Sequence, residues 1–278
     1  DSAAVLVEAV SGVEVGTEAV WAAAEAYGRP RVLVVNKMDR ENVRVRRVKE
    51  SIANNLSGHF VDLQLPIGEG PAFKGVVDLL HMEARVGEKG DKAPIPADMQ
   101  SAAEDARAAL VEAAAEGDDA LIEKFLEGEE LTGAEVARGL KLATLNGVVT
   151  PILYCAGETG VGVDALLDAF VDLLPAPNEV GGFTATDARG ESATYEVSDA
   201  SPLAVFIFKS REDNFGKTSY LRVFGGTLAS DSRIWDGARN AEVRVGTLQI
   251  SSGKETSPIG KLHAGDRAWW ALTTRLRV

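Results

Sequence analysis

Three short, mostly apolar segments constrain the fold of this chain more than any other feature. They occupy residues 4–10, 32–35 and 151–154, and each is far shorter than the ~20 apolar residues of a membrane-spanning helix. Strands that are apolar on both faces are typical of a parallel sheet covered on both sides. Helical patterns at about residues 14–27, 41–56 and 163–174 alternate with these segments. The pattern therefore predicts βαβ units and an α/β domain.

A long interval interrupts this alternation between residues 63 and 150. It contains Ala- and Glu-rich helical stretches, including residues 102–116 and the stretch after Thr132. Thr132 and Glu135 have the spacing of a capping box at the start of that last helix. Connections within α/β units are usually ~2 to 6 residues long. We therefore predict a helical or α+β insert subdomain at about 63–150, inside an α/β domain that spans residues 1–178.

The remainder of the chain has a different pattern. Residues 179–199 are polar and rich in turn-forming residues, which predicts a linker. Short alternating segments follow at 203–208, 218–224, 242–248 and 267–272, separated by glycine-containing turns. This spacing predicts an antiparallel β-barrel over residues 200–278. We expect that barrel to be incomplete, because residues 273–278 stop before it would close.

Charge and cysteine content narrow the class of protein. Residues 200–278 carry 12 Lys and Arg against 7 Asp and Glu, a net charge of +5, whereas residues 1–199 carry 17 against 35, a net charge of −18. A basic second part suits either a nucleic-acid partner or an ordinary solvated surface. The single cysteine, Cys155, excludes an internal disulfide and a thiolate-cluster metal site, and it predicts a reducing, cytoplasmic compartment.

The tetrapeptide Asn36-Lys37-Met38-Asp39 carries the most specific chemistry. It directly follows the apolar segment 32–35, and ligands of α/β sheets bind at the carboxyl ends of strands. The two carboxylate oxygens of Asp39 can accept from the N1–H and the 2-amino group of guanine, a pair that adenine does not offer. Asn36 can reach the other edge of the base, and the alkyl stem of Lys37 can lie along its plane. The alternative is a polar turn between strand and helix.

Small residues follow the third apolar segment. Ala156 and Gly157 would let backbone N–H groups come close to a ligand, where they can donate to the guanine carbonyl oxygen. The sequence thus predicts a second element of the same site, after a neighbouring strand.

Together with these motifs, segments along nearly the whole chain resemble elongation factor G, beginning just after its second switch region. The segments are residues 5–13, 17–21, 31–40, 63–68, 73–79, 122–128, 173–177 and 220–226. The chain also begins without Met and runs at once into an apolar stretch, so we expect it to be a piece of a longer protein.

The resemblance implies a function and partners. Asn36, Lys37 and Asp39 would recognise the base of GTP or GDP, with Ala156 and Gly157 in place of the family's Ser-Ala pair. The insert would face the ribosomal stalk protein, and the barrel would touch the rRNA of the small ribosomal subunit. The parent protein, expected to be a cytoplasmic monomer, would hydrolyse GTP with Mg²⁺ on the ribosome during translation.

The sequence also limits what this chain can do alone. A phosphate-binding loop G-x-x-x-x-G-K-[ST] is missing, and only Gly216-Lys217-Thr218 comes near, with Arg211 where the first Gly belongs. Since positioning the γ-phosphate and Mg²⁺ supplies most of the catalysis in phosphoryl transfer, residues 1–278 alone should not hydrolyse GTP, and they should bind it very weakly. No metal site or nucleophile-base-acid set is predicted.

Other interpretations stay open. The parent could be a ribosome-protection or termination factor of the same superfamily, or the chain could be a non-catalytic ribosome-binding module. It could also be an unrelated α/β enzyme in which residues 36–39 form a turn. Three scattered histidines and a basic helix are read as ordinary surface features; these residues are His59, His81, His263, Arg40, Arg44, Arg46, Arg47 and Lys49.

Overall fold

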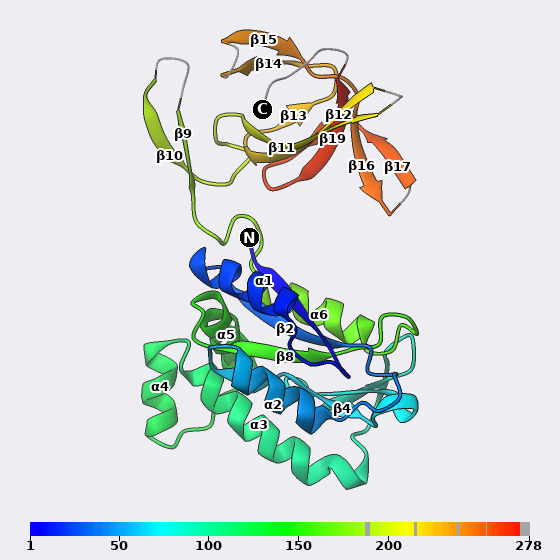
Figure 1. Ribbon diagram of the computed structural model, residues 1–278. Coiled ribbons are helices and arrows are strands. Elements are labelled where there is room, and N and C mark those ends of the chain that lie inside the picture. Colours follow the sequence, from blue (N-terminus) through cyan, green and yellow to red (C-terminus); the bar gives the residue numbers. More distant parts are fainter. Residues whose placement is uncertain (187–189, 214–215, 238–239, 254, 273–278) are drawn as a thin grey trace. The chain divides into compact units, whose positions relative to one another are not determined.

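The computed structural model describes residues 1–186, 190–213, 216–237, 240–253 and 255–272 (Figure 1). The chain divides into two compact units, Asp1–Pro175 and Ala176–Val278, and each is described here by itself. Within the described ranges, no helix combines the length and the apolar character that a membrane span requires.

A four-stranded parallel sheet forms the centre of the first unit. Its strands are β1 (Ala3–Glu8), β2 (Arg31–Asn36), β8 (Thr150–Tyr154) and β3 (Phe60–Asp62), in the order β1-β2-β8-β3. Strands β2 and β8 are almost entirely buried, and they lie between neighbours on both sides. Three of the four strands were predicted from their apolar runs. Strand β3 was not, because three residues with a single buried side chain give no recognisable pattern.

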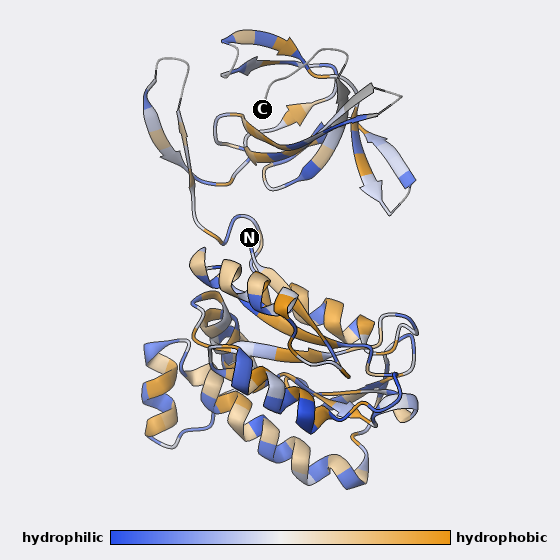
Figure 2. Cartoon of the chain, in the orientation of Figure 1, coloured by the Kyte–Doolittle hydropathy of each residue, from blue (hydrophilic) through white to orange (hydrophobic). Residues whose placement is uncertain are grey.

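Helices cover both faces of this sheet, as Figure 1 shows. On one face, Trp21 of α1 (Val15–Ala26) and Ile52 of α2 (Val45–Asn55) share a core with Leu33 of β2. On the other face, Leu173 of α6 (Val163–Leu173) shares a core with Val34 of β2. Alternate residues of one strand therefore enter two cores, which explains the continuous apolar run in the sequence. Figure 2, which is coloured by hydropathy, shows the apolar residues of β1 and β2 in orange.

Two layers make up the interval between β3 and β8. An antiparallel sheet contains β4 (Gln64–Ile67), β5 (Gly75–Asp78), β6 (Glu83–Val86) and β7 (Asp91–Ala93). It is followed by the helices α3 (Gln100–Ala115), α4 (Asp119–Leu126) and α5 (Gly133–Leu145), with short 3-10 turns at Gly70–Ala72 and Ala97–Met99. Residues of both layers belong to one core with the parallel sheet. The helical part was predicted, whereas the four short strands were not.

The predicted capping box at the start of α5 is confirmed. The Thr132 hydroxyl accepts from the Glu135 backbone N–H, and the Glu135 carboxylate accepts from the Thr132 N–H at 2.7 Å. Lys124 of α4 also donates to Glu135 at 2.9 Å. These hydrogen bonds lower the pKa of Glu135 to about 2, with the Lys124 bond as the largest cause. The local sequence thus fixes where this helix begins.

The second unit consists of antiparallel strands around its own core. A five-stranded sheet has the order β11-β12-β19-β16-β17, formed by Ala204–Asp213, Gly216–Gly225, Arg267–Leu272, Leu248–Ser252 and Glu255–Ile259. Shorter pairs are β13 (Leu228–Ala229) with β18 (Lys261–Leu262), and β14 (Arg233–Asp236) with β15 (Ala241–Arg244). The predicted fold class, an α/β part followed by an all-β part, is confirmed. The predicted failure to close concerns residues 273–278, which lie outside the described residues.

Two details of the second unit differ from the predictions. The expected linker contains a hairpin, β9 (Phe183–Thr186) with β10 (Ser192–Tyr195), because Phe183 packs against Tyr195 and Phe224 with ring centroids 5.7 Å apart in both pairs. The expected strand at 242–248 is two strands, since β15 ends at Arg244 and β16 begins at Leu248. Between them the Val245 N–H donates to the Ser232 carbonyl, so the chain changes from one strand pair to the next sheet.

Candidate guanine-recognition site

Two loops at one edge of the parallel sheet contain all the predicted site residues. Strands β2 and β8 are parallel neighbours, and Val35 pairs with Tyr154 at their carboxyl ends. The Asn36 loop (residues 36–44) follows β2, and the Gly157 loop (residues 155–162) follows β8. The structure thus brings these two loops together where ligands of α/β sheets bind.

The side chain of Asn36 joins the two loops. Its Oδ1 accepts from the Lys37 N–H at 2.7 Å and from the Gly157 N–H at 3.0 Å, and the Cys155 thiol lies 3.5 Å away. These donors fix the orientation of the amide, because only its oxygen can accept from them. The Nδ2 group is therefore the part of Asn36 that remains to donate to a ligand.

Lys37 is held in an uncommon geometry. Its φ of 61° lies in the left-handed region, which non-glycine residues adopt rarely and at an energetic cost. The ammonium pairs with Glu8 at the end of β1, with 2.9 Å between Nζ and Oε1. Glu8 also accepts from the Ser11 hydroxyl at 2.7 Å, and these hydrogen bonds, that of Ser11 first, lower the pKa of the Glu8 carboxyl. The stem of Lys37 is thereby stretched between its loop and β1.

Asp39 presents a carboxylate with no internal partner. Within the part of the chain that the structure describes, it makes neither a hydrogen bond nor an ion pair. It is half-buried, and the neighbouring Met38 is fully buried and donates its N–H to the Cys155 carbonyl at 3.2 Å. A buried side chain thus anchors the turn, while both oxygens of Asp39 remain able to accept two donors from one ligand edge.

The backbone N–H groups of Ala156 and Gly157 already have acceptors within the chain. The Ala156 N–H donates to the Val161 carbonyl at 2.9 Å, and the Gly157 N–H is already engaged by Asn36. That backbone donors of this loop bind a guanine carbonyl stays a prediction, and a ligand would have to share or replace these bonds. A Cβ at Gly157 would lie 3.4 Å from Asn36 Oδ1, so the small residue does permit a close approach.

Cys155 lies between the two loops and is buried. Burial raises the pKa of its thiol from 9.0 to about 11, and the nearby negative charge of Asp39 adds to this effect. The thiol is thus neutral at physiological pH and packs as a small apolar group.

Two residues of the site region escaped the sequence reasoning. Glu8 holds Lys37, as described above, and Glu158 pairs with Arg40 across the two loops at 3.5 Å. A polar residue at the end of an apolar strand could have indicated Glu8, because such positions face the ligand edge of the sheet. Glu158 carries no comparable signal.

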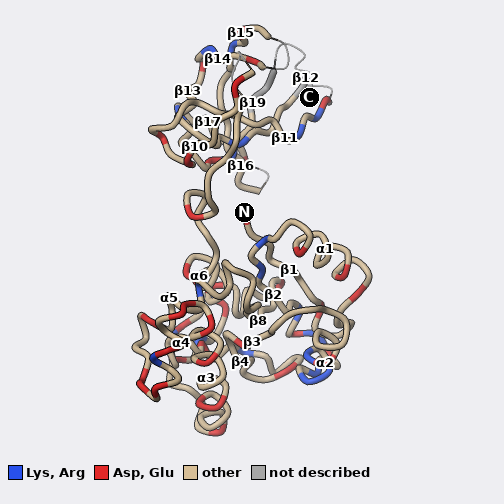
Figure 3. Tube along the Cα trace, turned by 90° about the vertical axis from the view of Figure 1, so that its left-hand side faces the viewer, with Lys and Arg blue, Asp and Glu red and all other residues tan. Residues whose placement is uncertain are grey.

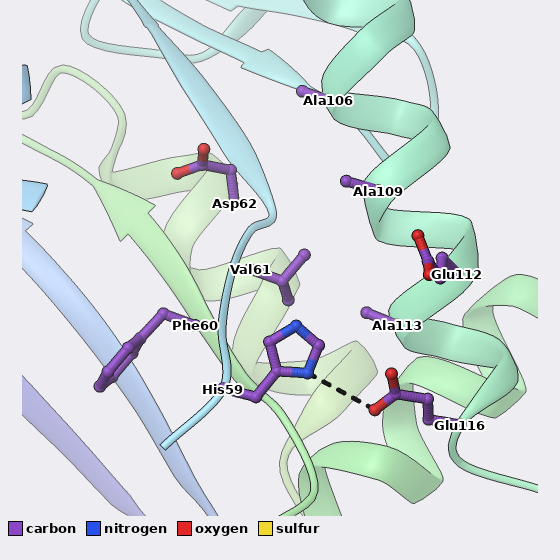
Figure 4. A pocket seen from close by; sticks show the side chains of 9 residues that line it. All are labelled: His59, Phe60, Val61, Asp62, Ala106, Ala109, Glu112, Ala113 and Glu116. Atoms are coloured by element: carbon purple, nitrogen blue, oxygen red, sulfur yellow. Dashed lines mark ion pairs between the residues drawn. The ribbon is translucent and has the colours of Figure 1, made fainter. Parts of the chain in front are cut away.

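The three histidines have exposed side chains, as expected for surface residues. Each pairs with a carboxylate: His59 with Glu116 at 3.4 Å, His81 with Asp78 at 2.9 Å, and His263 with Asp199 at 2.6 Å. The first pair sits in a cleft of about 270 Å³ between β3 and α3, shown in Figure 4. Within the residues that the structure covers, no three His, Cys, Asp or Glu side chains are grouped to hold a metal ion.

The Gly216-Lys217-Thr218 segment and the basic residues near α2 were expected to have no role in nucleotide binding. The Gly216-Lys217-Thr218 segment lies in strand β12, which pairs with β11, and it is not a phosphate loop. The basic residues near α2 gather in Figure 3 as a blue cluster. Several of them have acidic partners, such as Arg46 with Glu50 at 3.7 Å and Lys49 with Asp62. Such pairs are typical of a solvated helix face.

Comparison with known proteins agrees with this geometry. The family model described as "Elongation factor Tu GTP binding domain" matches residues 1–176. A crystal structure of a protein from Thermus thermophilus is similar, with a TM-score of 0.82 and 29% sequence identity. That similarity covers 98% of this chain and 39% of the other, so this chain spans about two fifths of the length of that protein.

Proposed function

Because residues 1–176 make this chain a member of the elongation factor Tu GTP-binding domain family, we propose that it supplies the guanine-recognition half of a GTP site in a ribosome-associated GTPase. The observation that carries the proposal is the Asp39 carboxylate, which lies without an internal partner beside Asn36 at the ligand edge of the sheet. An acceptor pair in this place suits the N1–H and 2-amino group of guanine.

The roles of the five residues follow from their contacts. Asp39 selects guanine over adenine, and Asn36 donates from Nδ2 while its oxygen ties the loops. Lys37 lies along the base and is held by Glu8. Ala156 and Gly157 leave room for the carbonyl edge of the base, which shares the Gly157 N–H with Asn36.

The sequence of residues 1–278 has no phosphate-binding loop G-x-x-x-x-G-K-[ST], the motif that would hold the phosphates and place a hydroxyl on Mg²⁺. We propose that a phosphate-binding segment elsewhere in the protein completes the site beside β1. Strand β1 is the edge of the parallel sheet, and its Leu6 side chain is 57% exposed in the middle of the strand. Hydrolysis would depend on that segment, because it would position the γ-phosphate and the metal.

The ribosome is the proposed partner. On the second unit, Phe206 and Phe208 of β11 are 58% and 50% exposed, and Lys209 lies over the Tyr220 ring at 5.9 Å. Exposed aromatic rings beside cations can stack on unpaired bases of rRNA. On the insert, α4 exposes 79% of Leu126, which suits a protein partner such as the stalk.

Calorimetry tests the nucleotide part of the proposal. The full-length protein encoded by the reading frame should bind GDP and GTP but not ADP, and ribosomes should stimulate its hydrolysis of GTP. Residues 1–278 alone should bind GDP more weakly than micromolar. Equal affinity for ADP and GDP in the full-length protein would refute guanine recognition, and micromolar GDP binding by residues 1–278 would refute the need for a second half.

Ribosome co-sedimentation tests the partner. Replacing Phe206 and Phe208 by Ser should reduce co-sedimentation of the full-length protein, whereas Trp235→Ser, at a residue that is 52% exposed on another strand pair, should not. Equal loss in both variants would argue against a stacking surface on β11.

A further inference from the structure

The insert subdomain lies next to the two proposed guanine loops, the Asn36 loop and the Gly157 loop. Its β4–β5 turn (residues 68–74) is close to the Asn36 loop, and its β6–β7 turn (residues 87–90) is close to the Gly157 loop. The main polar contacts go to the helices that follow these loops, α2 and α6.

The β4–β5 turn caps the helix that follows the Asn36 loop. Helix α2 has no side-chain cap of its own, and Glu69 Oε1 accepts from the N–H of Val45, its first residue, at 2.9 Å. The second carboxylate oxygen of Glu69 lies 3.9 Å from Arg44. At the neighbouring Gly70, an added Cβ would lie 3.1 Å from the Arg40 carbonyl. A carboxylate at a helix N-terminus satisfies a free N–H and interacts favourably with the helix dipole.

The sheet next to the β6–β7 turn holds the helix that follows the Gly157 loop. The Arg85 side chain is only 12% exposed, and it donates to Asp164 and, at 2.8 Å, to Asp168 on α6. Burial lowers the pKa of Arg85, but the hydrogen bond to Asp164 and the two negative charges outweigh it and leave the pKa raised. Gly90 lies so close that a Cβ there would be 2.6 Å from the Asp164 carboxylate.

The link from α6 back to the Gly157 loop is short. The Gly160 N–H donates to the Ala156 carbonyl at 2.9 Å, and the Val163 N–H donates to the Gly160 carbonyl at 3.1 Å. Gly160 is also next to the turn, since a Cβ on it would lie 3.7 Å from Glu88. A displacement of α6 would therefore reach Ala156 and its neighbour Gly157 through only a few bonds.

Few contacts join the two loops to each other directly. The ion pair between Arg40 and Glu158 is exposed on both sides, at 56% and 77%, and pairs of this kind contribute little. Two backbone N–H groups join the loops directly: the Gly157 N–H donates to Asn36 Oδ1 at 3.0 Å, and the Met38 N–H donates to the Cys155 carbonyl at 3.2 Å. The Arg85 side chain is only 12% exposed and pairs with two carboxylates that are 45% and 60% exposed, so removing the arginine should disturb α6 more than breaking the exposed pair would disturb the loops.

We propose that Glu69 and Arg85 are positioning residues, through which the insert holds the two guanine loops at the spacing that a base requires. The inference rests on the proposed guanine-recognition function and goes beyond it, because it makes the insert a determinant of nucleotide affinity. Asp39 would accept from the N1–H and the 2-amino group, and the Gly157 loop would donate to the neighbouring carbonyl oxygen, so a change in the spacing of the loops weakens these contacts.

The experiment uses the full-length protein and two nucleotides. GDP and inosine diphosphate differ only in the 2-amino group that Asp39 is proposed to accept from, so the ratio of their affinities reports on loop position. Calorimetry would compare the wild type with Glu69→Ala, Arg85→Ala and Arg85→Lys. Lys124→Ala is the matched control. It breaks the ion pair between Lys124 and Glu135, whose atoms are 2.9 Å apart and which lies on the insert helices and not on either turn.

We expect Glu69→Ala and Arg85→Ala each to weaken GDP binding by about 10-fold and to narrow the GDP preference over inosine diphosphate. Arg85→Lys, which keeps the charge but lacks the planar fork, should fall between. Lys124→Ala should leave the ratio unchanged. The Lys variant also keeps the test valid if Arg85→Ala does not fold.

Two outcomes would overturn the inference. In one, the variants bind both nucleotides like the wild type. In the other, they lose thermal stability or affinity while the ratio stays constant, which would indicate a merely structural role. A wild-type protein that does not bind GDP would instead refute the proposed function, so the two failures are distinguishable.

Discussion

The Asn36 loop and the Gly157 loop, which we propose bind the same base, differ in the parts of the chain that they present. The Asn36 loop presents side chains, above all the Asp39 carboxylate, on a turn anchored by buried Met38. The Gly157 loop presents backbone, and its residues matter because they are small. We infer that the first loop provides selectivity for the base and that the second provides space. Substitutions that remove side-chain atoms should therefore weaken GDP binding when made in the Asn36 loop, and substitutions that add atoms should weaken it when made in the Gly157 loop.

Asp39→Ala, in the loop that acts through its side chains, should cause the largest loss of GDP affinity. It removes a charge-assisted bidentate acceptor, which contributes roughly 3 kcal/mol, so GDP affinity of the full-length protein should fall about 100-fold. Calorimetry with GDP would measure the change. Asp39→Asn, which has the same size but offers a donor in place of one acceptor, should also bind GDP poorly. Retained affinity in both variants would show that the side chain does not read the base.

The buried thiol of Cys155, which lies between the two loops, should make the stability of the fold depend on pH. Because its folded pKa of about 11 lies above the ordinary value of 9.0, the folded state favours the neutral thiol. The resulting stability is fully present below pH 9 and is lost as the pH rises from 9 toward 11, by about 2 to 3 kcal/mol.

Urea unfolding of the chain at pH 8 and pH 10.5 would measure this loss. Cys155→Ala should remove the part of the pH dependence that the thiol causes, and its stability should fall less over the same interval. If the free energy of unfolding fell equally in the variant and the wild type, the Cys155 thiol would not be the cause of the pH dependence.

Gly157→Val tests the role of space. Its Cβ would lie 3.4 Å from Asn36 Oδ1, and two further methyl groups would press on that side chain or on a base beside it. We expect roughly 1 to 1.5 kcal/mol of lost GDP affinity, about 10-fold, at nearly unchanged stability. Gly157→Ala is the matched control, since one carbon at this distance can be accommodated. Equal loss for Ala and Val would indicate a backbone effect instead.

Glu8→Gln should have the smallest effect. The pair with Lys37 is partly exposed, with the two side chains 29% and 47% accessible, so neutralising Glu8 should weaken GDP binding by about twofold. The effect should shrink at high salt, which calorimetry at two ionic strengths would reveal. A loss as large as that of Asp39→Ala would mean that Glu8 contacts the nucleotide itself.

Much of the fold followed from the sequence, because burial on both faces leaves continuous apolar runs such as those of β2 and β8. The family prediction is confirmed by the match over residues 1–176. The four strands of the insert escaped because they are three or four residues long and interrupted by glycine and proline turns. The β9–β10 hairpin escaped because polar pairs such as Thr186 with Ser192 conceal its two anchoring aromatic residues.

The candidate site was predictable in its residues but not in its connections. The tetrapeptide that ends in Asp39 directed attention to one loop, and the small residues around Gly157 directed attention to the other. The Gly157 N–H already donates to Asn36 Oδ1. This bond depends on the strand order, which brings together two residues that are 121 positions apart in the sequence. Glu69 and Arg85 escaped for the same reason, since local patterns carry no information about which distant helix a side chain meets.

The place where the insert leaves and rejoins the sheet also bears on how such proteins diversify. It leaves after Asp62 and returns at Thr150, on neighbouring strands where Phe60 pairs with Thr150. The two ends are thus only roughly 8 Å apart, given ordinary strand spacing and rise. Closing a longer segment between fixed ends costs little, about 0.6 kcal/mol for each doubling of its length. The parallel sheet can therefore accept exchange or enlargement of the outer parts of this insert during evolution, as long as the contacts of Glu69 with α2 and of Arg85 with α6 persist.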